Sequence, residues 1–232
     1  MASVVGLRAV FLGAPGAGKG TQAQRLAAAG RALHISTGDM LREHVKSGTT
    51  LGRAAKSFMD AGKLVPDDVI IAMVEARIGG IGGTDSKTAP ASWILDGFPR
   101  TLLQASALDK KLSAPGLTHA VWFAVPAGVL TKRLTGRRTC GKCGAIWHVE
   151  FKPTKKTDLC DVCGGTLVQR DDDRPAAVQQ RLDVFAQQTE PLLAYYRESG
   201  KLVEIDANRS PDQVFQQLTT AVERRPAADS NR

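Results

Sequence analysis

Short apolar runs alternate with longer, more polar stretches along this chain. The apolar runs have the length of β-strands and cover Leu7–Leu12, Leu33–Ile35, Ser92–Leu95, His119–Val125 and Leu202–Ile205. Helices are predicted between them, because residues typical of helix starts, such as Ser, Thr, Asp and Pro, stand at the beginnings of these stretches. Strands that alternate with helices predict an α/β fold, here a parallel five-stranded sheet with helices on both faces.

The segment Gly13–Thr21 joins the first predicted strand to a helix-forming run. Its sequence, GAPGAGKGT, follows the pattern G-x-x-x-x-G-K through Lys19, but Gly20 stands where Ser or Thr is expected and the hydroxyl comes one residue later, at Thr21. In such a turn, backbone N–H groups and the positive end of the next helix face one anion, and the lysine adds a mobile cation. The segment is therefore predicted to be a P-loop that holds a polyphosphate.

Asp96 ends the third apolar run and is followed by Gly97-Phe98-Pro99-Arg100. An acid at the carboxyl end of a buried strand in a P-loop protein typically holds magnesium, directly or through water, and we predict this role for Asp96. The alternative is an acid that only caps a turn. Ligands of parallel sheets bind at the carboxyl ends of the strands, so the P-loop, Thr37, Asp96 and Arg100 are expected to gather there.

The four cysteines lie in one segment as two C-x-x-C pairs with sixteen residues between them. This spacing is typical of a four-thiolate zinc site, formed by Cys140, Cys143, Cys160 and Cys163, with iron as the alternative metal. Four thiolates leave no open coordination position, so the metal is expected to be structural. His148 lies between the pairs and is interpreted as a packed residue and not as a ligand.

The length and net charge of the chain exclude few classes of protein. The 232 residues suit one domain with small insertions, and the net charge of +8 suits nucleic acid, an anionic surface or a small polyanion without choosing among them. The apolar stretch Val4–Leu12 contains Gly6 and Arg8, which favours a strand over a signal peptide or membrane span. We expect a cytoplasmic protein with reduced thiols. Residues 79–91 are predicted to form a connecting loop and 224–232 a polar tail.

The order of these motifs resembles that of the adenylate kinases, in the long form that carries a metal-binding lid. The family loop, G-x-P-G-x-G-K-G-T, is followed here by ISTGDMLR at 35–42, LDGFPR at 95–100 and GRR at 136–138, and the resemblance covers nearly the whole chain. It implies a core P-loop domain of residues 1–35, 66–136 and 175–232. It also implies a helical AMP-binding insertion at 36–65 and a small zinc-ribbon-like lid at 137–174 that closes on ATP.

The resemblance further implies roles for individual residues. The ATP-binding residues would be Gly16, Ala17, Gly18, Lys19, Gly20, Thr21, Arg133, Arg137 and Arg209. The AMP-binding residues would be Thr37, Arg42, Val65, Gly97, Arg100, Gln104, Arg170 and Arg181, with Gln104 on the adenine edge. The catalytic residues would be Lys19, Arg100, Arg133, Arg137, Arg170 and Arg181. Asp172 and Asp173 are expected to meet the arginines, while Arg138 and Arg174 are expected to be surface ion-pair partners.

Elementary chemistry agrees with this assignment. A phosphoryl group in transfer carries its charge on oxygen atoms, so its transfer needs positioned cations and the exclusion of water more than an acid or a base. We therefore predict an adenylate kinase activity, ATP + AMP = 2 ADP, that serves adenine nucleotide homeostasis. The expected cofactor is Mg²⁺, and the lid is expected to hold structural Zn²⁺. The partners of the chain would be ATP, AMP and ADP, without nucleic acid or membrane, and a monomer is expected.

Two other functions remain open from the sequence. The first keeps the fold but changes the acceptor to another nucleoside monophosphate such as UMP or CMP, because only Thr37, Val65 and Gln104 argue for adenine. The second is a nucleic-acid-binding ATPase that uses the cysteine segment as a grip, with Trp147 and Phe151 as stacking surfaces. The arginines argue against the second function, because they cluster in phosphate motifs.

Overall fold

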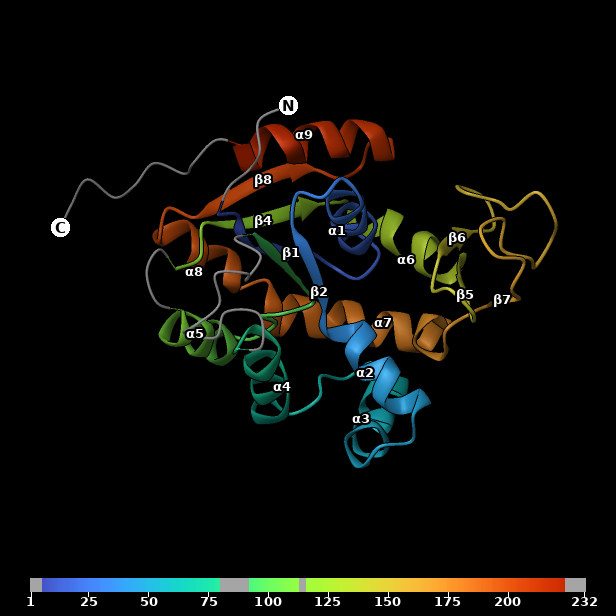
Figure 1. The fold of residues 1–232 in the computed structure, drawn as a ribbon, viewed down its shortest axis with the longest axis horizontal. Coiled ribbons are helices and arrows are strands. Elements are labelled where there is room, and N and C mark those ends of the chain that lie inside the picture. Colours follow the sequence, from blue (N-terminus) through green and yellow to red (C-terminus); the bar gives the residue numbers. More distant parts are fainter. Residues whose placement is uncertain (1–5, 80–91, 113–115, 224–232) are drawn as a thin grey trace.

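The central sheet has five parallel strands. The structure, a computed structural model, describes residues 6–79, 92–112 and 116–223 (Figure 1). The strands are β1 (Arg8–Leu12), β2 (Leu33–Ser36), β3 (Trp93–Asp96), β4 (His119–Ala124) and β8 (Leu202–Asp206), in the order β2-β3-β1-β4-β8. Every neighbouring pair is parallel, so the predicted fold class is confirmed. The loop predicted after Gly79 and the tail from Arg224 lie outside the described residues.

Alternate residues of each strand face opposite sides of the sheet, and each side is covered by helices. Val10 and Leu12 of β1 pack in one apolar cluster, whereas Ala9 and Phe11 pack in the other. The first cluster includes residues of α4 (Asp67–Gly79), α5 (Leu102–Lys111) and α8 (Leu192–Glu198); the second includes residues of α1 (Lys19–Ala28), α6 (Ala127–Thr135) and α9 (Pro211–Glu223). In Figure 1, α9 of the second group lies above the sheet, and α4 and α5 of the first group lie below it.

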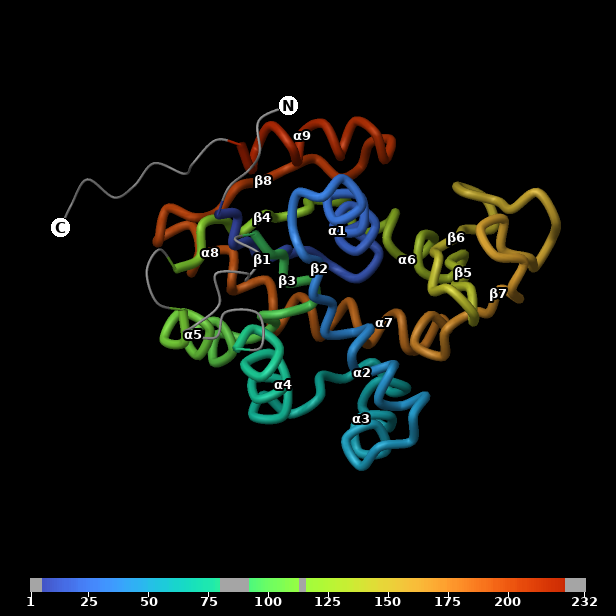
Figure 2. Tube along the Cα trace, in the orientation of Figure 1, coloured from blue at the N-terminus to red at the C-terminus, as the bar shows by residue number. Residues whose placement is uncertain are grey.

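Two short helices, α2 (Thr37–Lys46) and α3 (Thr50–Asp60), follow β2 and project from the core as a pair (Figure 2). Each begins at a hydroxyl: Ser36 Oγ accepts a hydrogen bond from the N–H of Asp39, and Thr49 Oγ1 accepts one from the N–H of Gly52. A side-chain oxygen at this position satisfies one of the free N–H groups of a helix start. Ser36 and Thr49 therefore cap the starts of α2 and α3.

A small three-stranded antiparallel sheet lies at one end of the molecule. Its strands are β5 (Arg137–Cys140), β6 (Ile146–His148) and β7 (Leu167–Val168), in the order β6-β5-β7. We call residues 137–168 the cysteine lobe. The short helix η1 (Asp171–Asp173) then leads the chain back to the core through α7 (Pro175–Val184).

The helical stretch that begins at Pro175 is interrupted just before Pro191. The interruption is a π-helical turn, η2 (Phe185–Thr189), between α7 and α8. Such wide turns often occur at functional sites, and Thr189 of this turn faces the loop after β3. In the described part of the chain, no helix is both long and apolar enough to span a membrane.

Candidate active site

A cavity of about 790 Å³ opens at the carboxyl ends of β1 and β3. It reaches from the P-loop to α2, to the cysteine lobe and to the loop after β8. All of the predicted nucleotide-binding and magnesium-binding residues line it: Gly16, Ala17, Gly18, Lys19, Gly20, Thr21, Thr37, Arg42, Val65, Asp96, Gly97, Arg100, Gln104, Arg133, Arg137, Arg170, Arg181 and Arg209. The cationic side chains predicted from distant motifs therefore share one cleft.

The P-loop lies between the end of β1 at Leu12 and the start of α1 at Lys19. Lys19 Nζ donates hydrogen bonds to the carbonyl oxygens of Gly13, at 2.6 Å, and Ala14, at 3.0 Å. The ammonium group is thus held against the loop itself, at the site where the loop is expected to cradle phosphate.

Gly20 and Asp96 lie against each other at the base of the cavity. A Cβ atom at Gly20 would stand 3.1 Å from Asp96 Oδ2, closer than most such contacts in proteins. This close approach explains why glycine stands where the general P-loop pattern has Ser or Thr. Asp96 Oδ2 also lies 3.2 Å from His34 Nε2, and an ionised carboxylate can only accept, so this nitrogen carries a proton and donates it to Asp96.

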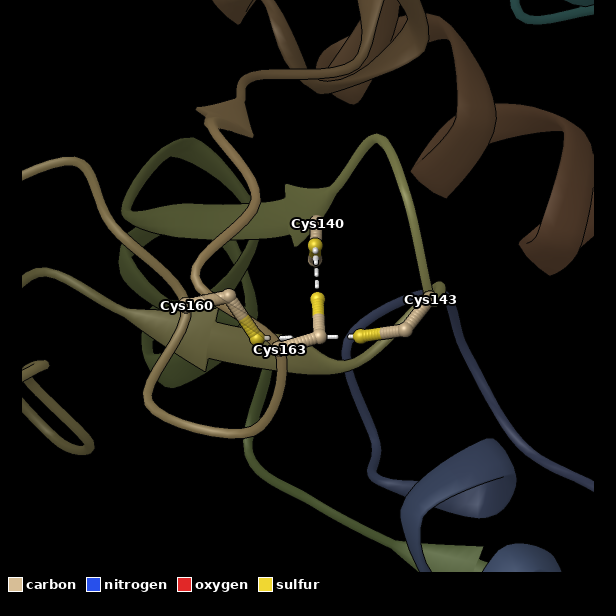
Figure 3. Close-up of side chains that lie close together, drawn as sticks. All are labelled: Cys140, Cys143, Cys160 and Cys163. Carbon is tan, nitrogen blue, oxygen red and sulfur yellow. Dashed lines mark hydrogen bonds between the residues drawn. The ribbon is translucent and has the colours of Figure 1, made fainter.

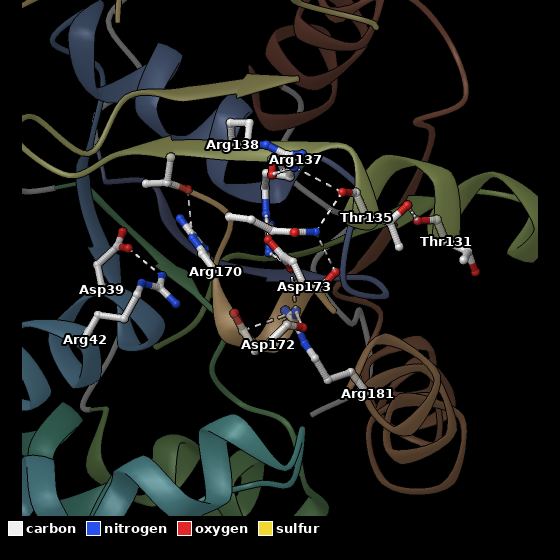
Figure 4. Close-up of polar contacts among 12 residues, drawn as sticks. Asp39, Arg42, Thr131, Thr135, Arg137, Arg138, Arg170, Asp172, Asp173 and Arg181 are labelled. Atoms are coloured by element: carbon white, nitrogen blue, oxygen red, sulfur yellow. Dashed lines mark hydrogen bonds and ion pairs between the residues drawn. The ribbon is translucent and has the colours of Figure 1, made fainter. Parts of the chain in front are cut away.

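The cysteine lobe is tied to the core by ion pairs to a fully buried carboxylate (Figure 4). Arg137 of β5 donates to both oxygens of Asp173, at 2.5 and 2.7 Å, and Arg181 of α7 donates to one of them at 3.0 Å. Arg181 also lies 3.2 Å from a carboxylate oxygen of Asp172. The expected contacts of these two aspartates with the arginines are therefore present.

Other predicted phosphate ligands are held by local partners. Arg42 forms an ion pair with Asp39 at 2.6 Å, within α2. Arg170 Nε donates to Thr139 Oγ1 at 2.9 Å, and Arg100 Nε donates to the carbonyl oxygen of Gly97 at 2.9 Å. Each guanidinium group retains further N–H donors, because a guanidinium has five.

The charges of the cavity are desolvated and unbalanced. Burial lowers the pKa of Lys19 to about 8; nearby Asp96 opposes this shift and Arg100 adds to it. Burial and then Arg181 lower the pKa of Arg100 to about 10, and burial followed by Arg42 lowers that of Arg170 to about 10. Cations that are buried and repel one another are stabilised by a bound anion, so the cavity is suited to a polyphosphate.

The cavity has two ends at which a nucleotide base could be bound. At one end, Gln104 is buried beside Val65, and Thr37 Oγ1 donates to the carbonyl oxygen of Gly97 at 3.0 Å. At the other end, Arg133 donates to the carbonyl oxygen of Ala207 at 3.1 Å, after β8. Arg209 lines this second end as well, although its side chain is half exposed and paired with Asp206.

Three polar residues that support the site were not predicted from the sequence. His34 contacts Asp96, Asp67 contacts Gln104, and Thr189 Oγ1 donates to the carbonyl oxygen of Arg100 at 2.9 Å. Asp67 lies in the first turn of α4, where an acid complements the helix dipole, and this location gives no sign of a contact with Gln104. For His34, the sequence indicated only that it lies in a short predicted strand, and the structure places this strand beside the one that ends at Asp96.

The four cysteines converge on one point in the cysteine lobe (Figure 3). Their sulfur atoms lie within 4.8 Å of one another, with Cys140 and Cys163 3.5 Å apart and Cys143 and Cys160 3.6 Å apart. Tetrahedral zinc, with Zn–S bonds of about 2.3 Å, places sulfur atoms about 3.8 Å apart, so the cluster fits this metal.

The backbone around the cluster also suits thiolates. Burial raises the pKa of the Cys160 thiol, but the N–H groups of Val162 and Cys163 outweigh it and lower that pKa to about 6. A Cβ atom at Gly165 would stand 3.0 Å from Cys140 Sγ, so only glycine fits against the sulfur atoms without a shift. The predicted metal site is therefore supported by its geometry and by its surroundings.

His148 does not belong to the sulfur cluster, as expected. Its Nδ1 accepts from the N–H groups of Glu150 and Phe151, both at 3.0 Å, and its Nε2 lies 3.2 Å from the carbonyl oxygen of Lys132. Of the two arginines expected in surface ion pairs, Arg174 pairs with Asp171. Among the described residues, the guanidinium group of Arg138 donates to the backbone carbonyl oxygens of residues 135 and 137.

A P-loop that opens onto a cation-lined cavity at the carboxyl edge of a parallel sheet defines a phosphotransferase of the P-loop class. Comparisons with known proteins narrow this class. A model of the adenylate kinase family matches residues 11–201. The adenylate kinase of Desulforudis audaxviator is 49% identical over 218 residues, which cover 93% of this chain and 99% of the relative. That of Carboxydothermus hydrogenoformans is 46% identical over 220 residues, which cover 94% and 100%, respectively.

The chain belongs to the adenylate kinase family. It is a nucleoside monophosphate kinase, and its chemistry is phosphoryl transfer between adenine nucleotides.

Proposed function

We propose that this chain catalyses the magnesium-dependent, reversible transfer of the terminal phosphoryl group of ATP to AMP, which gives two molecules of ADP and serves adenine nucleotide homeostasis. The observation that supports this proposal is the convergence of Lys19 with arginines from α2, β5, α7 and the loop after β3 on one cavity. A transferring phosphoryl group needs such a set of cations more than it needs a general base.

The cavity divides naturally between two nucleotides. The P-loop side, with Gly16–Thr21, Arg133 and Arg137, would bind ATP, and the loop around Arg209 would contact its adenine. The side next to α2 would bind AMP, with Arg42 and Arg100 on its phosphate and Thr37, Val65, Gly97 and Gln104 around the nucleoside. Under this proposal, residues 36–65 form the AMP-binding insertion, residues 137–174 form the lid, and the other residues form the core.

The residues between the two nucleotides would act on the group in transfer. Lys19 would exchange its bonds to the P-loop carbonyl oxygens for phosphate oxygens. Arg137, Arg170 and Arg181 would surround the transferring oxygens, and the planar guanidinium can hold two of them at once. Because Asp173 ties Arg137 to Arg181, the position of the cysteine lobe would determine whether this set is complete.

Two metal ions would complete the enzyme. Asp96 would hold Mg²⁺ through water, and the ion would neutralise charge on the ATP phosphates; His34 and Lys19 outweigh the effect of burial and keep the pKa of Asp96 below its usual value, so the carboxyl group stays ionised. Cys140, Cys143, Cys160 and Cys163 would hold structural Zn²⁺ and so stabilise the lid.

The test is a coupled assay of ADP formation with ATP and each of AMP, CMP, UMP and GMP, with and without Mg²⁺. AMP is expected to be the best acceptor, and chelation of Mg²⁺ is expected to abolish turnover. A preference for CMP or UMP would instead identify another monophosphate kinase. Oligonucleotide binding with a steep salt dependence, without ADP formation, would identify the nucleic-acid-binding ATPase.

The proposed form is a cytoplasmic monomer that acts on small molecules, without nucleic acid or membrane partners. Support for the compartment comes from the four free thiols, which suit a reducing environment. Sedimentation of the loaded enzyme tests the monomer directly.

A further inference from the structure

Gln104, the residue proposed to meet the adenine edge, is held by two partners outside the base. Its Oε1 accepts a hydrogen bond from the N–H of Arg100 at 2.7 Å. Its Nε2 donates to Asp67 Oδ1 at 2.6 Å, and the other oxygen of Asp67 accepts from Thr101 Oγ1 at 2.8 Å. Gln104 lines the cavity, whereas Asp67, the first residue of α4, stands behind it.

These two partners require the same orientation of the amide. The N–H of Arg100 can only donate, so it must face the amide oxygen. The Asp67 carboxylate can only accept, so it must face the amide nitrogen. One N–H and one oxygen lone pair of Gln104 remain for a ligand, and their order is fixed because a flipped amide would oppose both partners.

Helix capping alone does not explain the contact with Asp67. Thr101 and Gln104 have the spacing of a capping box, and Thr101 Oγ1 accepts from the N–H of Gln104 at 3.2 Å. In a full capping box the glutamine oxygen would receive the N–H of Thr101, whereas here it receives that of Arg100. None of these capping bonds needs a carboxylate at position 67.

We propose that Asp67 is a positioning residue that determines which purine edge Gln104 accepts. The proposal rests on the proposed function, in which Gln104 meets the base of the monophosphate. Adenine presents an acceptor at N1 and a donor at its amino group, whereas the hypoxanthine of IMP presents a donor and an acceptor at the same places. A fixed amide therefore matches only one of them, and an amide free to flip can match both.

The test measures kcat and KM for AMP and for IMP at a fixed, saturating ATP concentration. In Asp67→Ala, the ratio of kcat/KM for AMP to that for IMP is expected to fall about tenfold, as for loss of a hydrogen bond to a charged group. The change should appear in KM, with kcat altered less than about threefold, and the KM for ATP should not change. Asp67→Asn retains one acceptor oxygen and should lose only about threefold in the ratio.

Asp68→Ala is the matched control. Asp68 lies in the same turn of α4 and contributes the same charge near the helix start, but its side chain is exposed. This variant should keep the parent ratio, and thermal unfolding of each variant shows whether it is folded. If Asp67→Ala does not fold, Asp67→Asn carries the test alone.

The Gln104→Ala variant distinguishes failure of the proposed role of Asp67 from failure of the proposed base site. If it lowers the AMP-to-IMP ratio while both Asp67 variants keep the parent value within about twofold, the role of Asp67 is overturned and the proposed function stands. If Gln104→Ala itself leaves the ratio unchanged, Gln104 does not meet the base, and the proposed base site is overturned together with the role of Asp67.

Discussion

The nucleotide cavity gathers many cations and the cysteine lobe gathers four thiols, but the two regions are supported in different ways. The cations of the cavity come from strands and helices that pack on two large apolar clusters. In the described part of the lobe, the buried apolar cluster consists of Cys140, Trp147, Cys160 and Leu167, so two of the metal ligands are themselves part of the core. The cavity is therefore expected to form without its ligand, whereas the lobe is expected to depend on the proposed metal for its fold.

Because of this difference, ligand binding and fold stability are affected differently in the two regions. In the cavity, burial and mutual repulsion lower the pKa of the cations, so the unoccupied site lowers the stability of the fold and a bound phosphate restores it. In the lobe, the free energy of metal binding is free energy of folding. Removing a cation and removing the metal should therefore have opposite effects on stability, although both reduce activity.

The largest effect on activity is expected for Lys19→Met. The value of kcat/KM should fall at least about 10³-fold, because Lys19 is proposed to neutralise charge on the group in transfer. The pKa of Lys19 is lowered from 10.5 to about 8 by burial, so at pH 7, below both values, the folded protein bears the whole cost of charging it. The melting temperature of the ligand-free protein should therefore rise by about 2–4 °C.

The exposed Lys110 supplies the control for this prediction. Lys110→Met should change neither kcat/KM nor the melting temperature. A clear drop in the melting temperature of Lys19→Met would show that its bonds to Gly13 and Ala14 outweigh burial, and the contrast between the two regions would then be lost.

Metal removal should produce the next largest effect. Chelation, or Cys160→Ser, should melt the cysteine lobe in a separate transition at lower temperature, because the lobe has little apolar area of its own. Activity should fall about tenfold or more, since Arg137 lies on β5 of the lobe. Calorimetry, with ATP binding as a measure of the intact P-loop, checks both results. Addition of zinc should restore the chelated protein, and an unchanged melting curve would refute a structural metal.

A pH titration of ATP binding should reveal the lowered pKa of Lys19 in the cavity. The free site has a Lys19 pKa of about 8, and phosphate favours the charged form, so binding takes up a proton above pH 8. The affinity for Mg–ATP should be constant below pH 8 and fall by up to about tenfold per pH unit above it. Calorimetric titration from pH 7 to 9, below the pKa values of about 10 of Arg100 and Arg170, measures this slope. Lys19→Arg should show no such loss, and an equally flat profile for the parent would contradict the lowered pKa.

Local sequence patterns predicted the parts of the molecule that depend on neighbouring residues. The P-loop from Gly13 to Lys19 and the two C-x-x-C pairs are contiguous, so their residue order already indicates their geometry. The five strands were recognisable as apolar runs. Because the carboxyl ends of parallel strands lie at one edge of a sheet, Asp96 was expected beside the P-loop, and the structure places both in one cavity.

The support behind the site was not predictable in the same way. His34 and Asp96 are 62 residues apart, and Asp67 and Gln104 are 37 apart, so each contact depends on which elements become neighbours in space. The apolar pattern indicated a parallel sheet but not its order, and the pairing of β2 with β3 is what brings His34 to Asp96. Arg138 shows the same limit, since its partners are backbone carbonyl groups, which no side-chain pattern reveals.

The smallest effect on activity is expected for His34→Leu, at the edge of the cavity where His34 contacts Asp96. Burial raises the pKa of Asp96, but the hydrogen bond from His34, followed by the charge of Lys19, lowers it below its usual value. Removal of the donor should raise that pKa, so the acid limb of the kcat–pH profile should move to higher pH, with kcat lowered at the acid end of the profile and unchanged at pH 8.

His34→Gln is the matched variant for this prediction, because its amide N–H can still donate to the carboxylate. It should retain the parent profile, and both variants should keep the parent melting temperature within about 2 °C. An acid limb that moves equally in both variants would show that the imidazole acts by filling space. Asp96 would then be kept ionised by Lys19, and the cation of the cavity would control both ends of the proposed magnesium and phosphate site.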